Sequence, residues 1–307
     1  MNSEAATEEM CCANCGISAI DNVKLKYCDG GCDLVKYCSD GCQENQKDQH
    51  GEECRKRLIE IRDRNLFTVP EGSHCHWGEC PICCLPLPLE GPKSTFMGCC
   101  SKLICNGCDH ANQIREIKAG LKQRCAFCRE LMPKTAEECY KRCMKRIKKN
   151  DPVAMSYMGR GCIDEGDYET ALEYFKKSAE MGDPDAHYNL SIMYHKGDGV
   201  EKDMKKEIYH LEEATIGGHP DARHNLGCEE AMNGNFERAR KHFIIAANLG
   251  YHDSLKMVLR LHTMGHASKE DYANALRTYQ AAVDETKSSE REEAELFDKF
   301  QEAAQQS

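Results

Sequence analysis

The sequence lacks a long apolar run and an excess of basic residues. No window approaches the roughly 18 consecutive apolar residues that a membrane span needs, so we expect no spanning helix. Residues 1–10 have neither a basic start nor an apolar stretch, so we expect no secretory signal. The formal net charge is −10, which disfavours nucleic-acid binding because phosphate recognition needs a basic surface.

Motifs for small-molecule catalysis are also missing, and cysteine is scarce in the second half. We find no Gly-rich phosphate loop, Ser-His-Asp pattern or carboxylate pair outside the segments discussed below. Of 22 cysteines, four come after residue 130, namely Cys139, Cys143, Cys162 and Cys228. A protein stabilised throughout by disulfides would carry more cysteines in this half. We expect a reducing compartment, cytoplasmic or nuclear, where clustered cysteines more often bind metal than form disulfides.

The first cysteine cluster spans residues 12–54. Its ligand candidates come as Cys-x2-Cys, Cys-x3-Cys, Cys-x3-Cys and His-x3-Cys pairs. Each pair can supply two ligands to one tetrahedral Zn²⁺, and His50 and Cys54 can share one side of a helix. The cluster therefore predicts two zinc sites. Their ligands are Cys12, Cys15, Cys28, Cys32, Cys38, Cys42, His50 and Cys54.

This cluster resembles a MYND-type zinc finger, most closely at Tyr37–Gln43 and at the final His-x3-Cys pair. The resemblance implies that the two sites interleave. One ion would be held by Cys12, Cys15, Cys38 and Cys42. The other would be held by Cys28, Cys32, His50 and Cys54. Lys47 stands where the family often carries a tryptophan that binds proline-rich peptides, so the resemblance predicts zinc binding and leaves peptide binding open.

The second cluster spans residues 80–128. Three Cys-x2-Cys pairs and one adjacent pair provide enough thiolates for two more tetrahedral sites, which brings the prediction to about four Zn²⁺ per chain. The segments Cys80–Cys83 and Cys125–Arg129 resemble a RING finger with all-cysteine ligands, over residues 80–129. The cross-brace of that family implies one site made of Cys80, Cys83, Cys105 and Cys108. It implies a second site made of Cys99, Cys100, Cys125 and Cys128.

RING fingers of ubiquitin ligases make no bonds themselves but hold a ubiquitin-charged conjugating enzyme in a reactive posture. The resemblance implies that apolar residues of the finger contact this enzyme, namely Ile82, Ile114 and Phe127. It also implies that the cationic Arg129 contacts ubiquitin. The usual His is missing among the middle ligands, and Ala126 stands where ligases usually carry Pro. A non-catalytic scaffold or adaptor therefore remains the alternative function.

Two segments flank this finger. Residues 55–79 form a linker whose first part has helical apolar spacing and can extend a helix beginning near His50. In His74–Trp77, metal-capable side chains lack a partner pair, so we interpret the run as packing.

Residues 134–149 are basic, and Cys139, Cys143 and Ile147 recur every four residues, which predicts an amphipathic helix. We interpret its basic face as solvated, with a nuclear import signal or an acidic partner as the alternative.

The second half is repetitive. Ala154, Ala186, Ala222 and Ser254 recur at spacings of 32, 36 and 32, and an apolar residue follows each by four positions. Gly182, Gly218 and Gly250 stand where helices would end. The pattern predicts four antiparallel helix pairs over residues 151–286, with small residues where the helices approach. Because their spacing is irregular, we interpret the histidines on these helices, His187, His224 and His242, as packing or surface residues.

These units resemble Sel-one-like repeats, relatives of tetratricopeptide repeats, which bind proteins and carry no catalytic residues. An acidic helix or tail over residues 287–307 would cap them. The predicted fold is therefore multidomain, with two small zinc-stabilised cross-brace fingers followed by an all-α helical-repeat solenoid. The predicted function is a protein-interaction protein, of ubiquitin-ligase type or a scaffold, with protein partners and neither nucleic acid nor membrane.

Overall fold

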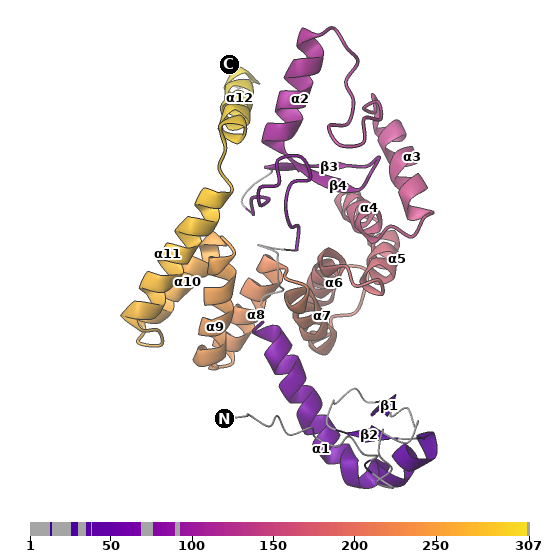
Figure 1. The fold of residues 1–307 in the computed structure, drawn as a ribbon, viewed down its shortest axis with the longest axis vertical. Coiled ribbons are helices and arrows are strands. Elements are labelled where there is room, and N and C mark those ends of the chain that lie inside the picture. The colour runs from indigo at the N-terminus through magenta and orange to yellow at the C-terminus, as the bar shows by residue number, and fades with distance from the viewer. Residues whose placement is uncertain are drawn as a thin grey trace, which may run out of the picture. The chain divides into compact units, whose positions relative to one another are not determined.

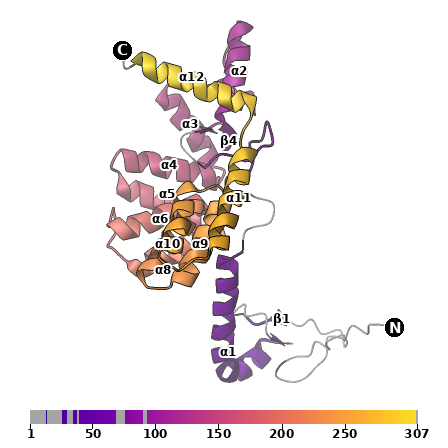
Figure 2. The ribbon, with the colours of Figure 1, turned by 90° about the vertical axis from the view of Figure 1, so that its left-hand side faces the viewer.

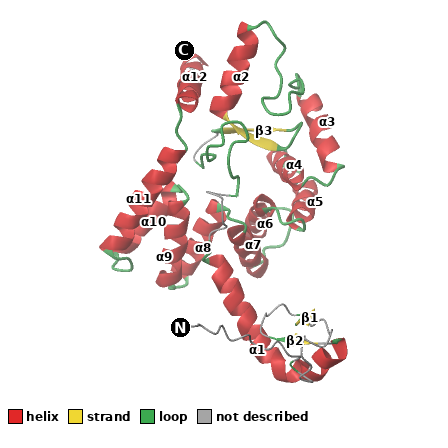
Figure 3. Cartoon of the chain, in the orientation of Figure 1, coloured by secondary structure: helices red, strands yellow, loops and turns green. Residues whose placement is uncertain are grey.

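The computed structural model describes residues 13, 26–29, 35–37, 39–68, 76–89 and 93–305. It contains two compact units, Met1–Thr68 and Val69–Ser307. Helices dominate the described residues, and two small antiparallel sheets accompany them (Figure 3). Within this part of the chain, no helix is both long and apolar enough to cross a membrane.

The first unit packs a two-stranded sheet against one long helix (Figure 1). Strand β1 (Lys26–Tyr27) pairs antiparallel with β2 (Lys36–Tyr37), and helix α1 (Asp40–Leu66) follows. The Ser39 hydroxyl caps α1 by accepting a hydrogen bond from the backbone N–H of Cys42. Because α1 is continuous, the residues predicted to extend the helix of His50 do so.

The second unit begins with a small finger. Strand β3 (Ser94–Met97) and strand β4 (Lys102–Cys105) form a hairpin in which Ser94 pairs with Cys105. Helix α2 (Asn106–Lys118) starts directly after β4. Buried Leu87, Met97 and Ile104 pack among the cysteines, so the core of this finger is small.

Helix α3 (Ala136–Ile147) confirms the predicted amphipathic helix. Its Thr135 hydroxyl accepts a hydrogen bond from the Glu138 N–H and caps it. On its buried face, Cys143 packs so tightly against the β3–β4 hairpin that a Cβ at Gly98 would lie 2.8 Å from the Cys143 sulfur. The helix therefore connects the finger with the helices that follow.

The repeat region is a stack of antiparallel helix pairs, as predicted (Figure 1). The predicted small residues Ala154, Ala186, Ala222 and Ser254 are all fully buried where the helices approach. The helices are α4 (Pro152–Asp164), α5 (Tyr168–Ala179), α6 (Pro184–Lys196), α7 (Met204–Ile216), α8 (Pro220–Met232), α9 (Phe236–Asn248), α10 (His252–Thr263) and α11 (Lys269–Glu285).

A glycine and a phenylalanine define the packing inside two of these pairs. A Cβ at Gly159 in α4 would lie 2.8 Å from the ring of buried Phe175 in α5, and Gly227 in α8 has the same relation to Phe243 in α9. A side chain larger than hydrogen would push the paired helices apart. Of the predicted histidines, His242 is fully buried and His187 nearly so, which agrees with their interpretation as packing residues.

Helix α12 (Ser289–Gln305) packs against α2 of the finger (Figure 2). The sequence predicted an acidic helix or tail here that caps the repeats. The Ser288 hydroxyl accepts a hydrogen bond from the Arg291 N–H at the start of this helix. A Cβ at Gly107 of α2 would lie 2.7 Å from the backbone nitrogen of Arg291, so the two backbones touch.

Candidate metal centres

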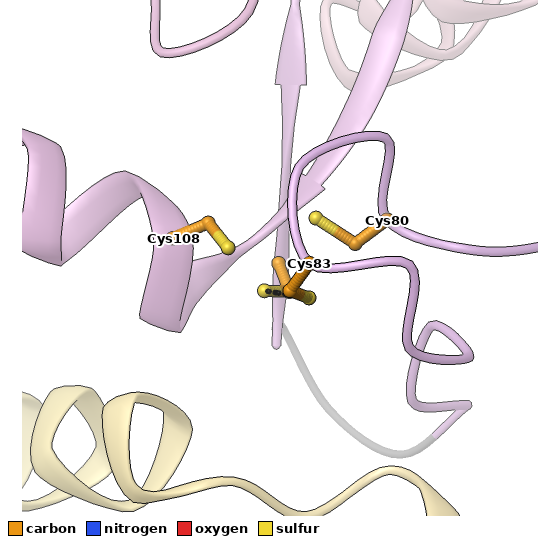
Figure 4. Close-up of side chains that lie close together, drawn as sticks. Cys80, Cys83 and Cys108 are labelled. Carbon is orange, nitrogen blue, oxygen red and sulfur yellow. Dashed lines mark hydrogen bonds between the residues drawn. The ribbon is translucent and has the colours of Figure 1, made fainter.

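Four cysteine side chains converge on one point of the finger in the second unit. The Sγ atoms of Cys80, Cys83, Cys105 and Cys108 all lie within 4.8 Å of one another. Cys80 and Cys83 come from a loop, Cys105 ends β4, and Cys108 projects from α2 (Figure 4). In the loop, the Cys80 N–H donates to the Leu85 carbonyl and the Cys84 N–H donates to the Cys80 carbonyl. This turn directs both loop sulfurs to the same side.

A second group of four lies in the same finger. The Sγ atoms of Cys99, Cys100, Cys125 and Cys128 also lie within 4.8 Å of one another. The loop at Cys125 repeats the turn of the first group, because the Cys125 N–H donates to the Glu130 carbonyl and the Arg129 N–H donates to the Cys125 carbonyl. The adjacent Cys99 and Cys100 both direct their sulfurs to this group. The two groups interleave along the chain in the order that the RING resemblance implies.

The sulfur separations test whether zinc fits these groups. A tetrahedral site with Zn–S bonds of about 2.3 Å has sulfur–sulfur edges of about 3.8 Å. The separations are 3.8 Å for Cys83–Cys105 and 3.9 Å for Cys100–Cys125, with a shorter 3.3 Å for Cys99–Cys128. A disulfide needs about 2.05 Å. The described cysteines of both groups are free, and their donor set and spacing fit zinc.

The first unit holds three of the predicted MYND ligands together. Ligand atoms of Cys28, His50 and Cys54 lie within 4.8 Å of one another, and the two sulfurs are 3.8 Å apart. His50 is nearly buried and meets Tyr37 edge-on, with ring centroids 6.4 Å apart. Cys42 lies in the first turn of α1. The remaining predicted ligands, Cys12, Cys15, Cys32 and Cys38, lie outside the described residues.

The thiols of the finger disturb each other electrostatically. A hydrogen bond from the Cys105 thiol lowers the pKa of Cys80 to about 4, and the same bond raises the pKa of Cys105. Burial raises the pKa of Cys100 and that of Cys108 to about 12. Four thiolates cannot share so small a volume without a cation. A bound divalent metal would supply that charge and displace the thiol protons.

A third cluster joins His76 of the linker to the repeats. His76 Nε2 lies 3.2 Å from Asp185 Oδ1, and His219 Nε2 lies 3.4 Å from the same oxygen. The Ala222 N–H donates to Nδ1 of His219, which leaves the His219 proton on Nε2, facing Asp185. Burial would raise the pKa of Asp185, but hydrogen bonds from His219 and His76 together with the charges of both rings outweigh it and hold the pKa well below its usual range.

Asp185 therefore joins His76 to His219. It anchors the linker, together with a bond from the His76 N–H to the Gly218 carbonyl. We interpreted His74–Trp77 as packing because no partner pair was close in sequence. The partners of His76 come instead from α6 and the start of α8, and no spacing pattern indicates such a pairing.

A groove of about 460 Å³ lies beside the first cysteine group. Two of the predicted partner contacts, Ile82 and Arg129, line it together with residues of α2 and with Ser288 and Glu290. The described residues that line this groove do not include the other two predicted contacts, Ile114 on α2 and Phe127. Phe127 is nevertheless exposed, at 43%.

Arg129 is bound to its own finger. Its guanidinium donates to the carboxylate of Glu116 and, at 2.7 Å, to Asn112 Oδ1. Glu116 is fully buried, and hydrogen bonds from the Arg124 N–H and from Arg129 hold its pKa below the usual value. The Arg129–Glu116 pair therefore braces the second cysteine loop against α2.

Comparison with protein families finds a MYND finger at residues 12–54 and Sel1 repeats at residues 153–183, 184–219 and 220–251. The matched repeats correspond to the pairs α4–α5, α6–α7 and α8–α9. The α10–α11 pair continues the same architecture beyond the matched region. Both kinds of module are generally protein-interaction modules.

Similar curated proteins share single short segments with this chain. An Arabidopsis thaliana ERAD-associated E3 ubiquitin-protein ligase component, HRD3B, is 46% identical over 14% of this chain and 7% of its own length. The putative beta-lactamase HcpC of Helicobacter pylori is 32% identical over 20% of this chain and 21% of its length. The chain thus spans at most about a fifth of either relative.

A solved Sel1 repeat protein from Oxalobacter formigenes is 21% identical, with a TM-score of 0.43, over 57% of this chain and 71% of that one. The chain combines a small N-terminal zinc finger of MYND type with an all-α region of Sel1 repeats.

Proposed function

We propose that this protein is a zinc-dependent interaction platform that presents a ubiquitin-conjugating enzyme on its RING-like finger. In this proposal, the finger and the MYND-type module hold about four Zn²⁺ through the predicted cysteines and His50. The repeats recruit a protein partner. The clustered thiolates need a reducing compartment, cytoplasm or nucleus.

One observation carries the proposal most. Interleaved cysteine groups flank α2, and a groove beside them is lined by Ile82 from one loop and Ala126 from the other. The exposed fraction of Ile82 is 42%, which leaves an apolar contact for a partner. Two metal sites would fix the separation of the loops, so the groove would keep its shape while an enzyme docks.

In this proposal, the finger catalyses by positioning. The finger makes no covalent bond. It holds the ubiquitin-loaded conjugating enzyme so that the thioester mainly adopts its reactive conformation. Arg129 keeps its contacts to Glu116 and Asn112, because a buried carboxylate without a partner would be costly. These contacts use two of the five guanidinium N–H groups, so others remain for ubiquitin.

The alternative is a non-catalytic adaptor, and one observation favours it. Arg129 is already engaged by Glu116 without any partner, which is also what a purely structural brace would do. In that case the groove would hold a protein that is not a conjugating enzyme, and the repeats would serve the same recruiting role.

An auto-ubiquitination assay with a panel of conjugating enzymes separates these functions. We expect activity with the full-length protein and its loss in Ile82→Ala. Leu121→Ala, which removes an exposed side chain outside the groove lining, is the matched control and should stay active. Silence of the parent protein across the panel, with its zinc retained, would leave the adaptor as the function.

A further inference from the structure

Arg291 of α12 extends into the finger and reaches the first cysteine group. Its Nη2 lies 3.5 Å from Cys83 Sγ and 3.3 Å from the Leu85 carbonyl oxygen. Its Nη1 donates to the carbonyl oxygen of Pro86 at 2.7 Å, and also to that of Thr286. The residue is only 7% exposed. An arginine more than 200 positions away in sequence is thus part of the surroundings of Cys83.

The charge of this guanidinium needs a partner. Throughout the described part of the chain, no carboxylate lies within ion-pair distance of Arg291. Apart from the Cys83 sulfur, its acceptors are carbonyl oxygens, which carry no net charge. Burying a cation without a counter-charge is unfavourable. A zinc ion with four thiolates has a net charge of −2, and it would stand directly beside the guanidinium.

We propose that Arg291 is an outer-shell residue of the first cysteine metal site, and that α12 is therefore part of the finger. The guanidinium donates to the Cys83 sulfur and neutralises part of the negative charge of the site. Such outer-shell hydrogen bonds orient the ligands and slow loss of the metal. This inference rests on the proposed zinc binding.

The contact between α2 and α12 holds Arg291 in place. Gly107 of α2 touches the Arg291 backbone, and any larger residue would force the helices apart. Farther along α12, Glu295 pairs with Lys93 at 3.0 Å and the Phe297 ring lies 4.7 Å from the ring of His110. Among the described residues, no side chain of α12 donates a hydrogen bond to a sulfur of the second cysteine group.

The test is zinc release from the full-length protein to a colorimetric chelator, for the parent and Arg291→Ala. Outer-shell substitutions typically weaken metal binding about 10–100-fold, so we expect one ion per chain to leave about 10–100 times faster. The other ions should leave at the parental rate. Glu293→Ala, which changes an exposed residue of the same helix, is the matched control and should release zinc as the parent does.

Two further variants keep the proposal testable if Arg291→Ala folds poorly. Gly107→Ala displaces α12 while Arg291 itself is retained, and it should speed release of the same ion. Arg291→Lys keeps the charge and loses the forked donors, so its release rate should lie between parent and Arg291→Ala. Parental release rates in both variants would overturn the inference. A parent protein that binds no zinc would instead refute the proposed zinc function.

Cobalt substitution gives a second readout. Thiolate–Co²⁺ charge-transfer bands report on the ligand sulfurs directly. We expect the band of one site to shift in Arg291→Ala, because a sulfur loses a charged hydrogen-bond donor. Reduced thermal stability with unchanged bands and unchanged zinc release would mean that Arg291 contributes packing alone, which contradicts the inference.

Discussion

The helical repeats bury histidines in their neutral form, and this predicts an acid-sensitive repeat region. Burial lowers the pKa of His210 to about 4 and that of His242 to about 3. An unfolded histidine titrates near 6.5, so between these values the unfolded chain binds more protons than the folded chain. The stability that these residues contribute is therefore complete above about pH 6.5 and is lost as the pH falls toward their folded values.

The slope of this loss follows from the proton count. Near pH 5, His210 and His242 together bind about two more protons in the unfolded state, and each proton changes the free energy of unfolding by about 1.4 kcal/mol per pH unit. Their combined slope is about 2.7 kcal/mol per pH unit. Burial also lowers the pKa of His187, His219 and His224, which adds to the slope. Burial raises the pKa of Asp183 and of Glu229, which subtracts from it.

Urea unfolding followed by far-ultraviolet circular dichroism at pH 5, 6 and 7 measures this slope. His242→Gln should reduce it by about 1.4 kcal/mol per pH unit near pH 5. Comparing variant and parent at each pH cancels proton uptake by the cysteine groups. Ser191→Ala, a buried substitution without a titrating group, should change stability but leave the slope unaltered. An unchanged slope in His242→Gln would refute the reasoning.

Two other substitutions test the packing and the modular organisation. Gly227→Ala should destabilise the repeats by about 1–3 kcal/mol in urea unfolding, because its Cβ would lie 2.8 Å from Phe243. Gly161→Ala, whose Cβ would meet no atom within 4 Å beyond its chain neighbours and the nearby backbone of its own helix, is the control, and equal effects would contradict the packing argument. Cys80→Ser should lose the first metal site and unfold the finger, while the helicity of the repeats persists. Collapse of the circular-dichroism signal of the helices would show that finger and repeats are one cooperative unit.

Short-range patterns predicted most of the architecture. The turn at Cys80 and the helix end at Gly182 are each formed by a few residues that are close in sequence. Spacing along the chain is therefore enough to predict them. The small residues at Ala154 and its equivalents recur because each repeat solves the same packing problem. The pairing of distant cysteines into interleaved sets came from the RING resemblance, and the structure groups the cysteines of the finger in the same sets.

Contacts between distant segments could not be predicted. The bond between Arg291 and Cys83 joins residues 208 positions apart, and His76 meets Asp185 across 109 positions. No period or motif encodes such pairs, because each depends on how whole elements pack. The same limit applies to α12, which the acidic sequence predicted as a helix or tail capping the repeats and which packs against α2 instead. Likewise, the resemblance assigned Arg129 to ubiquitin without indicating its contact with Glu116.

The central claim is that the cysteine groups of this protein are zinc sites. Elemental analysis of the full-length protein, purified under reducing conditions without chelator, tests it most directly. The account predicts about four zinc ions per chain. A cysteine-to-serine variant at one site should lose the zinc ion of that site. A content near zero in folded protein would contradict it.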